Sequence, residues 1–264
     1  MGGRKMNQLK VIMMSLKYNI MKQMTNKVTF LTNIIFMILN DATFIIQWVI
    51  LFGIKEDFGG YQLNNVLVLW ALAATVFGFS RLFFYKAFEL PDLIINGKLD
   101  SFLVQPKNVL LSIITSDTSI SAIGDILYGF IVVLFCHLTF AQFGLFVLFS
   151  LTGSIIITAF TVIISCICFK FVKGDVLVDT LSGAVISFAT YPDTIFKNTV
   201  KLLFYTIIPV GLTNYMPIHI IIKFDFVSLL IVLGVTVVST VLAFIVFNKG
   251  LKSYSSSNLM SSRV

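Results

Sequence analysis

The sequence predicts an all-α integral membrane protein with six membrane spans. Hydrophobic residues make up 58% of the 264 positions and charged residues only 12%, well below the roughly 25% of soluble domains. The mean hydropathy is +0.97. Apolar runs continue for roughly 20 residues without period-two alternation, which favours spanning helices over a β-barrel.

Residues 1–27 are predicted to form a cytoplasmic, interfacial amphipathic helix. Leu9, Met13, Leu16 and Ile20 recur at helical spacing, with lysines elsewhere around the helix. A solvated basic tail is the alternative. The apolar block that follows is too long for the core of a signal peptide and lacks a small-residue cleavage site, so it is expected to remain as the first span.

A transmembrane domain is predicted over 28–248, followed by a cytoplasmic tail over 249–264. Its spans are predicted at 28–54, 63–85, 109–136, 142–169, 176–213 and 226–248. The fifth is expected to break at Tyr191 and Pro192, because proline lacks an amide hydrogen and charged residues follow it. Short helices should then fill an outer re-entrant region at 190–225.

The distribution of basic residues predicts the orientation of the chain. Lys and Arg collect on the cytoplasmic side of membranes. With the N-terminus inside, all but four of the 19 Lys and Arg residues fall in cytoplasmic segments. The exceptions are Lys55, Lys197, Lys201 and Lys223. Both termini are therefore predicted to be cytoplasmic, and the net charge of +7 is attributed to orientation and not to nucleic-acid binding.

The longest predicted cytoplasmic loop, 86–108, connects spans two and three. Pro91 and Asp92 can start a short helix in it, and Asn96 with Gly97 can end that helix. This loop is the most polar stretch between two long apolar blocks, so it is expected to do more than reverse the chain.

A small apolar surface is predicted within this loop. Leu99, Phe102 and Leu103 should lie on one side, before Pro106 forces an extended turn into the third span. Such an apolar surface must be shielded from water by other groups. The chain's own helices, lipid headgroups or a partner protein could each provide this shielding.

The sequence contains no catalytic or metal-binding constellation. His137 and His219 lack sequence neighbours that would suggest a triad or a metal site. Cys136, Cys166 and Cys168 lie in apolar surroundings typical of core packing. The phosphate-loop motif is missing, so the chain is predicted to bind no ATP by itself and to be no enzyme.

Polar residues inside the first span predict a functional face. Asn33, Asn40 and Gln47 recur every seven residues, and Asp41 adjoins the face that they form. A charged residue at the middle of a lone helix costs about 2.5 to 3.5 kcal/mol on insertion scales, so Asp41 should face protein or water. The residues predict a transport path or a subunit interface, with hydrogen bonds inside the fold as the alternative.

The third span also begins with a polar half, which includes Asp117 and Asp125. Such a segment must be buried in the bundle or line a hydrated cavity. An alternative function is therefore an ion- or proton-coupled carrier or channel in which Asp41, Asp117 and Asp125 surround one cavity. A membrane enzyme acting on lipid would need convergent acid, base or metal groups, whereas the ionisable residues are scattered.

Four fragments carry a resemblance to a known family. They are NGKLDSFLVQPKNVL in the loop, the YPDTIF break, TIIPVGLTNYMP at 206–217 and FNKGLKSYSSSN at 247–258. Together they resemble the bacterial type 2 ABC transporter permeases, in the branch of small six-span permeases that pair with a second permease and a separate ATPase. The tail departs from the pattern at Ser255 and Ser256, where an acidic or small residue is expected.

The resemblance implies a non-catalytic permease of an ATP-driven exporter in the bacterial cell membrane. Its cargo would be hydrophobic or amphipathic, such as an antibiotic, a peptide or a lipid-like compound. Two copies of an ATP-binding subunit and a second, different permease are the implied partners, and ATP and Mg²⁺ would bind in the ATPase. The architecture implied includes an N-terminal interfacial helix, a cytoplasmic coupling helix and short outer helices between spans five and six.

In that family the loop at 86–108 is the coupling loop that contacts the ATPase. Leu99, Phe102 and Leu103 would supply apolar contact, and polar neighbours would fix the orientation. The coupling residues predicted in this way are Asp92, Lys98, Leu99, Asp100, Phe102, Leu103, Gln105 and Lys107.

Overall fold

The structure is a computed structural model that describes residues 8–55, 57–105, 107–171 and 173–254. Within these ranges every regular element is a helix. The start of the predicted interfacial segment, the predicted turn at Pro106, and the tail after Tyr254 with Ser255 and Ser256 lie outside the described residues.

Sixteen helical elements follow one another along the described chain. The first eight are α1 (Gln8–Gln23), α2 (Lys27–Ile54), α3 (Leu63–Phe84), η1 (Tyr85–Ala87), α4 (Leu90–Ile95), α5 (Asp100–Leu103), α6 (Val109–Ile114) and α7 (Ser121–Phe135). The others are α8 (Phe140–Ser165), η2 (Cys166–Phe169), α9 (Gly174–Ala189), η3 (Asp193–Ile195), α10 (Asn198–Thr206), η4 (Gly211–Tyr215), α11 (Met216–Ile222) and α12 (Phe226–Leu251). The element η4 is a short π-helix.

Helix α3 is the centre of the bundle. It packs most extensively against α7 and α8, while α2 packs on α7 and α12 packs on α8. Its middle is buried on nearly every side, with Leu69, Leu72 and Val76 fully covered. A helix that is apolar all around belongs in the interior, whereas α2 and α12 leave most of their apolar side chains exposed for lipid or a further subunit.

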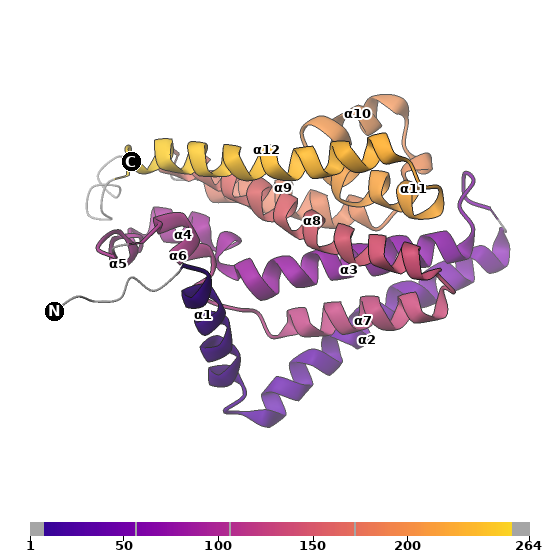
Figure 1. Ribbon diagram of the computed structural model, residues 1–264, viewed down its shortest axis with the longest axis horizontal. Helices are drawn as coiled ribbons and strands as arrows, with labels where there is room; N and C mark the ends of the chain where they lie inside the picture. Colours follow the sequence, from indigo (N-terminus) through magenta and orange to yellow (C-terminus); the bar gives the residue numbers. More distant parts are fainter. Residues whose placement is uncertain (1–7, 56, 106, 172, 255–264) are drawn as a thin grey trace.

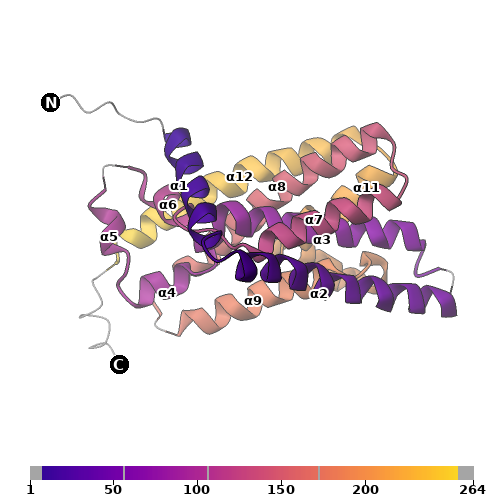
Figure 2. The same cartoon turned by 90° about the horizontal axis from the view of Figure 1, so that it is seen from below.

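The two ends of the bundle differ in structure. Figures 1 and 2 both place α1, α4, α5 and α6 together at one end, where α12 also ends. The α2–α3 connection and α11 lie toward the opposite end (Figure 1). That connection turns at Gly59 and Gly60, whose φ angles of 66° and 93° favour glycine. We refer to these ends as the α4 end and the α11 end.

Four helical segments of the described chain are long and apolar enough to cross a membrane. They are Lys27–Ile54, Leu63–Ile95, Phe140–Phe169 and Phe226–Leu251. A fifth candidate is the pair Asn198–Thr206 and Gly211–Ile222, which is bent by 88°. The apolar helices α7 and α9 have only 15 and 16 residues. The six-span layout, which counts both of them, stays a prediction.

The third predicted span, 109–136, is not one continuous helix. Its helical path stops after α6 and resumes at α7, leaving 115–120 without helix. The hydroxyls of Thr115 and Ser116 donate to the carbonyl oxygens of Leu111 and Ile113, over 2.6 and 2.7 Å. Serine, threonine and aspartate side chains offer the backbone such alternatives to helix, so their concentration here explains the interruption.

The fifth segment ends as a helix at Ala189. Tyr191 and Pro192 then lead into η3, which is followed by α10, η4 and α11. Aromatic contacts hold the chain there, because the buried ring of Phe204 lies tilted against Phe188 at a centroid distance of 4.8 Å. The short helices thus form a packed cap and not a loose loop.

Candidate functional site

The loop 86–108 folds back onto the α4 end of the bundle. The short helix predicted from Pro91 and Asn96 is α4, and Gly97 follows it with a φ of 66°. Leu90 and Ile94 are fully buried in a cluster that also contains Phe169 from η2 and Phe247 from α12. The loop therefore rests on the ends of α8 and α12, as well as on those of α3 and α6.

Leu99 is not exposed, which corrects the prediction that it contributes to an apolar contact surface. Its side chain is fully buried in the same cluster, so the chain's own core covers it. Phe102 is partly buried against this cluster. The exposed apolar side chains are Leu103 and Val104, which are 40% and 85% exposed. Of the three residues predicted to form the apolar surface, Leu103 is exposed as expected, and Val104 takes the place of the buried Leu99.

Polar side chains of the same loop are exposed as well. Those predicted to take part in coupling and found exposed are Asp92, Lys98, Asp100, Gln105 and Lys107. A cavity of about 210 Å³ opens beside them between α1 and α6, and Phe102, Gln105 and Lys107 line it. An apolar centre with a charged rim is the usual composition of a protein–protein contact. We call Leu103, Val104 and the five exposed polar residues the loop surface.

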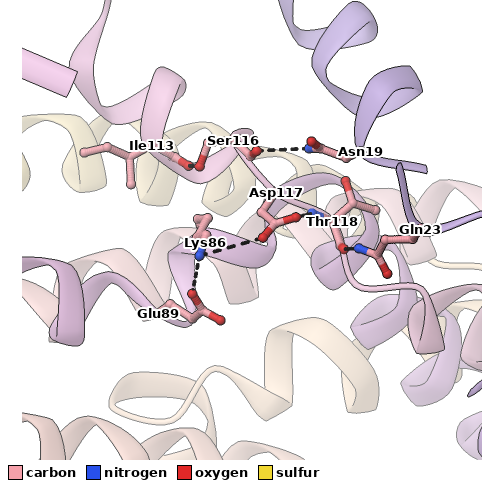
Figure 3. Close-up of polar contacts among 8 residues, drawn as sticks. All are labelled: Asn19, Gln23, Lys86, Glu89, Ile113, Ser116, Asp117 and Thr118. Carbon is pink, nitrogen blue, oxygen red and sulfur yellow. Dashed lines mark hydrogen bonds and ion pairs between the residues drawn. The ribbon is translucent and has the colours of Figure 1, made fainter. Parts of the chain in front are cut away.

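A polar network joins this loop to the interruption of the third span (Figure 3). The Lys86 ammonium pairs with Glu89, and its Nζ lies 3.8 Å from Asp117 Oδ2. Glu89 and Asp117 thus share one cation at the junction of η1, α4 and the non-helical segment.

Helix α1 is attached to the same segment by amide side chains. Asn19 Nδ2 donates to the carbonyl oxygen of Ser116 over 3.0 Å, and Gln23 Nε2 donates to that of Thr118 over 2.6 Å (Figure 3). Met13, from the predicted apolar stripe, is 58% exposed. The backbone carbonyls freed by the helix interruption are therefore the attachment points of α1.

A cavity of about 350 Å³ lies between α2, α3, α7 and α9. Its polar groups include Asp41, Arg81 and Asp125. Asp41 and Asp125 are 7% and 2% exposed, and their carboxyl groups interact directly. Aromatic rings, including those of Phe44 and Trp70, form much of the remaining wall. We call this space the aspartate cavity.

Two glycines bring Asp125 to this position. A Cβ on Gly124 would lie 2.8 Å from the carbonyl oxygen of Ile34 on α2, and one on Gly78 would lie 3.1 Å from Cβ of Asp125. Helix α7 can therefore approach both α2 and α3 only because these positions lack side chains. The close approach sets the two carboxyl groups against each other.

The other predicted polar residues are placed differently. Asn40 lines the aspartate cavity, whereas Asn33 and Gln47 do not and are exposed on α2. The buried positions of α2 are Ile34, Asp41 and Trp48, each one residue after the predicted polar face. Asp117 contacts Lys86 and lies outside the cavity lining. Arg81 was expected only as a cytoplasmic cation, and sequence reasoning missed its place in the cavity.

At the α11 end Asp193 collects three partners from distant elements. Tyr61 Oη donates to its Oδ1 over 2.8 Å, and Lys201 Nζ donates to its Oδ2 over 3.1 Å. His219 Nε2 lies 3.4 Å from Oδ1. Sequence reasoning gave His219 no partner, because these groups are separated along the chain by up to 158 residues. The cluster ties the α2–α3 connection to α11.

The comparison with protein families decides what this architecture belongs to. Residues 11–258 match the family described as ABC-2 family transporter protein. The chain is a member of this family of ABC transporter permeases. No curated protein and no solved structure matches it.

Membership of the ABC-2 family confirms that the chain resembles a type 2 ABC transporter permease, as its sequence indicated. The permease is a multi-pass, all-α membrane component of an ABC transporter, and its family associates with an ABC ATPase subunit. Among the described residues of this ABC-2 permease, no group of three or more His, Cys, Asp or Glu side chains is placed to hold a metal ion. The polar sites in the described part of the permease are the loop surface, the network of Lys86, Glu89 and Asp117, the aspartate cavity and the Asp193 cluster.

Proposed function

We propose that this permease is the membrane subunit of a bacterial exporter that moves a hydrophobic or amphipathic compound. It would work in the cell membrane with both termini cytoplasmic, beside a second permease of different sequence. Two copies of the ATPase would supply the energy, and ATP and Mg²⁺ would bind there. The family assignment supports the permease role. The loop surface supports docking of a partner protein, and the remaining statements rest on the resemblance and the charge distribution seen in the sequence.

The loop surface is the observation that carries the docking part of this proposal. Val104 is 85% exposed, although Leu99 on the same loop is packed into the core. An exposed apolar side chain, on a loop that also exposes charged side chains, fits a pocket on a protein partner better than it fits water. We assign this pocket to the ATPase, because the distribution of basic residues favours a cytoplasmic position for the loop.

The support under the loop suggests how movement would reach the membrane. Leu90, Ile94 and Leu99 share one buried cluster with the ends of α8 and α12. Lys86 also connects the start of the loop to Asp117 in the interrupted third span. Packed clusters transmit displacement because they resist compression. A push on the loop surface would therefore shift α6, α8 and α12 together.

Substitutions at the loop surface test this proposal. We expect Leu103→Ala and Val104→Asp to reduce recovery of the ATPase subunit when the affinity-tagged permease is purified from its native host in mild detergent. Both side chains are exposed, so the fold should tolerate the changes. Phe140→Ala is the matched control, because Phe140 is 94% exposed at the start of α8.

Undiminished ATPase recovery with both variants would contradict docking at this surface. Loss of ATPase with Phe140→Ala as well would show a general effect of removing exposed apolar groups. Basal ATPase activity of the purified complex provides a second readout, and it should fall in proportion to the recovered subunit.

The alternative function needed Asp41, Asp117 and Asp125 around one cavity. The structure brings Asp41 and Asp125 together but leaves Asp117 outside the cavity lining, beside Lys86. A relay through all three carboxyl groups therefore lacks the required geometry. The contact between Asp41 and Asp125 still needs a physical explanation, because placing two carboxyl groups together inside a membrane protein costs free energy.

A further inference from the structure

Unpartnered polar atoms gather at the aspartate cavity. Six described residues carry a buried side-chain nitrogen or oxygen without a hydrogen-bond partner, and three of them, Asp41, Trp70 and Asp125, line this cavity. Trp70 is 6% exposed, and its indole N–H is the unpartnered group. Buried polar groups in folded proteins are nearly always paired, so this concentration indicates a site that a bound group completes.

The charges at the cavity favour a cation. The carboxyl groups of Asp41 and Asp125 interact directly, and both also interact with the Arg81 guanidinium. Two carboxyl groups in contact share one proton when nothing else is bound. Once that proton leaves, the positive charge of Arg81 compensates one of the two negative charges and the other stays uncompensated. A monovalent cation between the carboxylates would neutralise it and relieve their repulsion. An anion would add to the repulsion, and a neutral compound would leave it unchanged.

The walls favour an apolar or aromatic body on that cation. Phe44 and Trp70 stack at a centroid distance of 4.3 Å on one side of the space, and Phe77 and Tyr191 also line it. Aromatic faces attract cations as well as apolar groups. The cavity volume of about 350 Å³ is in the range of small-molecule sites. A bare metal ion would use only a small part of such a space.

We propose that the aspartate cavity binds the cargo of this permease and that the cargo is a lipophilic monovalent cation. The positive group would lie between Asp41 and Asp125, and the apolar body would lie against Phe44 and Trp70. This inference deepens the proposed export function and rests on it. It narrows the cargo from any amphipathic compound to one that carries a positive charge.

Tetraphenylphosphonium and tetraphenylborate provide a matched pair of probes, because they share size and shape but carry opposite charges. Binding is measured by equilibrium dialysis against the full-length permease in phosphatidylcholine nanodiscs, with empty nanodiscs subtracted. Tetraphenylphosphonium should bind saturably, and tetraphenylborate should show no saturable binding. Equal binding of both probes would overturn the charge selectivity.

Substitutions in the cavity should act in opposite directions. Removing one carboxylate, as in Asp125→Asn or Asp41→Asn, should weaken tetraphenylphosphonium binding by about tenfold or more. Arg81→Gln removes the competing positive charge and should strengthen it by about threefold. Asp179→Asn is the control, because Asp179 is exposed on α9 and outside the cavity lining.

A misfolded variant cannot imitate this pattern, because general damage would not raise the affinity in Arg81→Gln. Unchanged binding in both asparagine variants would overturn the site. The result is also separate from the docking experiment, which uses ATPase recovery. If the ATPase is recovered but tetraphenylphosphonium does not bind, the cargo class is wrong and the permease role stands.

Discussion

Gln23 donates a 2.6 Å hydrogen bond from Nε2 to the backbone carbonyl oxygen of Thr118, across 95 positions of sequence. The bond joins α1 to the segment where the third span loses its helix (Figure 3). A continuous helix would have used that carbonyl internally. The interruption therefore supplies the acceptor, and α1 depends on it for attachment.

Replacing Gln23 with alanine should loosen α1. Losing one such hydrogen bond should reduce the free energy that holds α1 in place by about 1 kcal/mol. Hydrogen–deuterium exchange of the permease in nanodiscs would detect the loosening of α1 as faster amide exchange across this helix. The exchange rates in α3 should be unchanged. Lys10→Ala, an exposed substitution on the same helix, should leave the exchange rate as it is. Equal rates in Gln23→Ala and the wild-type permease would contradict the attachment.

Leu99 and Val104 lie five positions apart on one loop, but alanine should lower the free energy of unfolding by very different amounts at the two positions. Leu99→Ala removes a fully buried side chain and should cost about 2 to 5 kcal/mol of unfolding free energy. Val104→Ala should change it by less than about 0.5 kcal/mol, because that side chain is exposed. Unfolding in mixed micelles of increasing SDS content measures both. Similar losses in the two variants would argue against the burial described here.

The Asp193 cluster should make stability depend on acid pH. Burial alone would raise the pKa of Asp193, but its interactions with His219, Tyr61 and Lys201 outweigh burial and hold it well below its usual range. A carboxyl group with a depressed pKa stabilises the fold above its unfolded value near 4, and this contribution is lost as the pH falls through the folded value.

The measurement compares wild type with Asp193→Asn by thermal melting in detergent from pH 7 to pH 3. The wild-type permease should melt at a higher temperature by a constant margin above about pH 5, and the margin should narrow below about pH 4. A margin that stays constant to pH 3 would mean that the charge of Asp193 is not what stabilises the cluster.

Alanine substitutions at two glycines should have opposite signs. At Gly124 a Cβ would meet the carbonyl oxygen of Ile34 at 2.8 Å, so Gly124→Ala should separate α7 from α2 and lower the melting temperature. At Gly183 nothing lies within 4 Å of the added atom. Gly183→Ala should therefore stabilise α9 by about 0.5 to 1 kcal/mol, through helix propensity alone. Equal effects at the two positions would exclude close packing as the cause.

Much of the fold could be predicted because membrane-spanning helices consist of long, continuous runs of apolar residues. The helices α2, α3, α8 and α12 begin and end within a few residues of the predicted bounds. The interruption at 115–120 could not be placed in this way, since serine and threonine are also common inside membrane helices. Whether their hydroxyls support or replace the helix depends on neighbours such as α1.

The sites could be predicted only in part, for a geometric reason. The acidic residues of the aspartate cavity stood out because charges are rare inside membranes, but sequence could not tell that Asp125 meets Asp41 while Asp117 meets Lys86. Leu99 was predicted on the surface because its spacing places it on one side of the loop with Phe102 and Leu103. The cluster of Phe169 and Phe247, which covers it, comes from later in the chain.

The short length of α7 has a consequence for the surrounding membrane. Its 15 residues extend about 22 Å, against a hydrocarbon thickness of about 30 Å. The non-helical segment 115–120 continues from it toward the α4 end, and unpaired backbone groups avoid hydrocarbon. We therefore expect lipid headgroups and water to dip inward beside α7 and α1, so that shorter-chain lipids relieve the mismatch and longer-chain lipids strain this side of the permease.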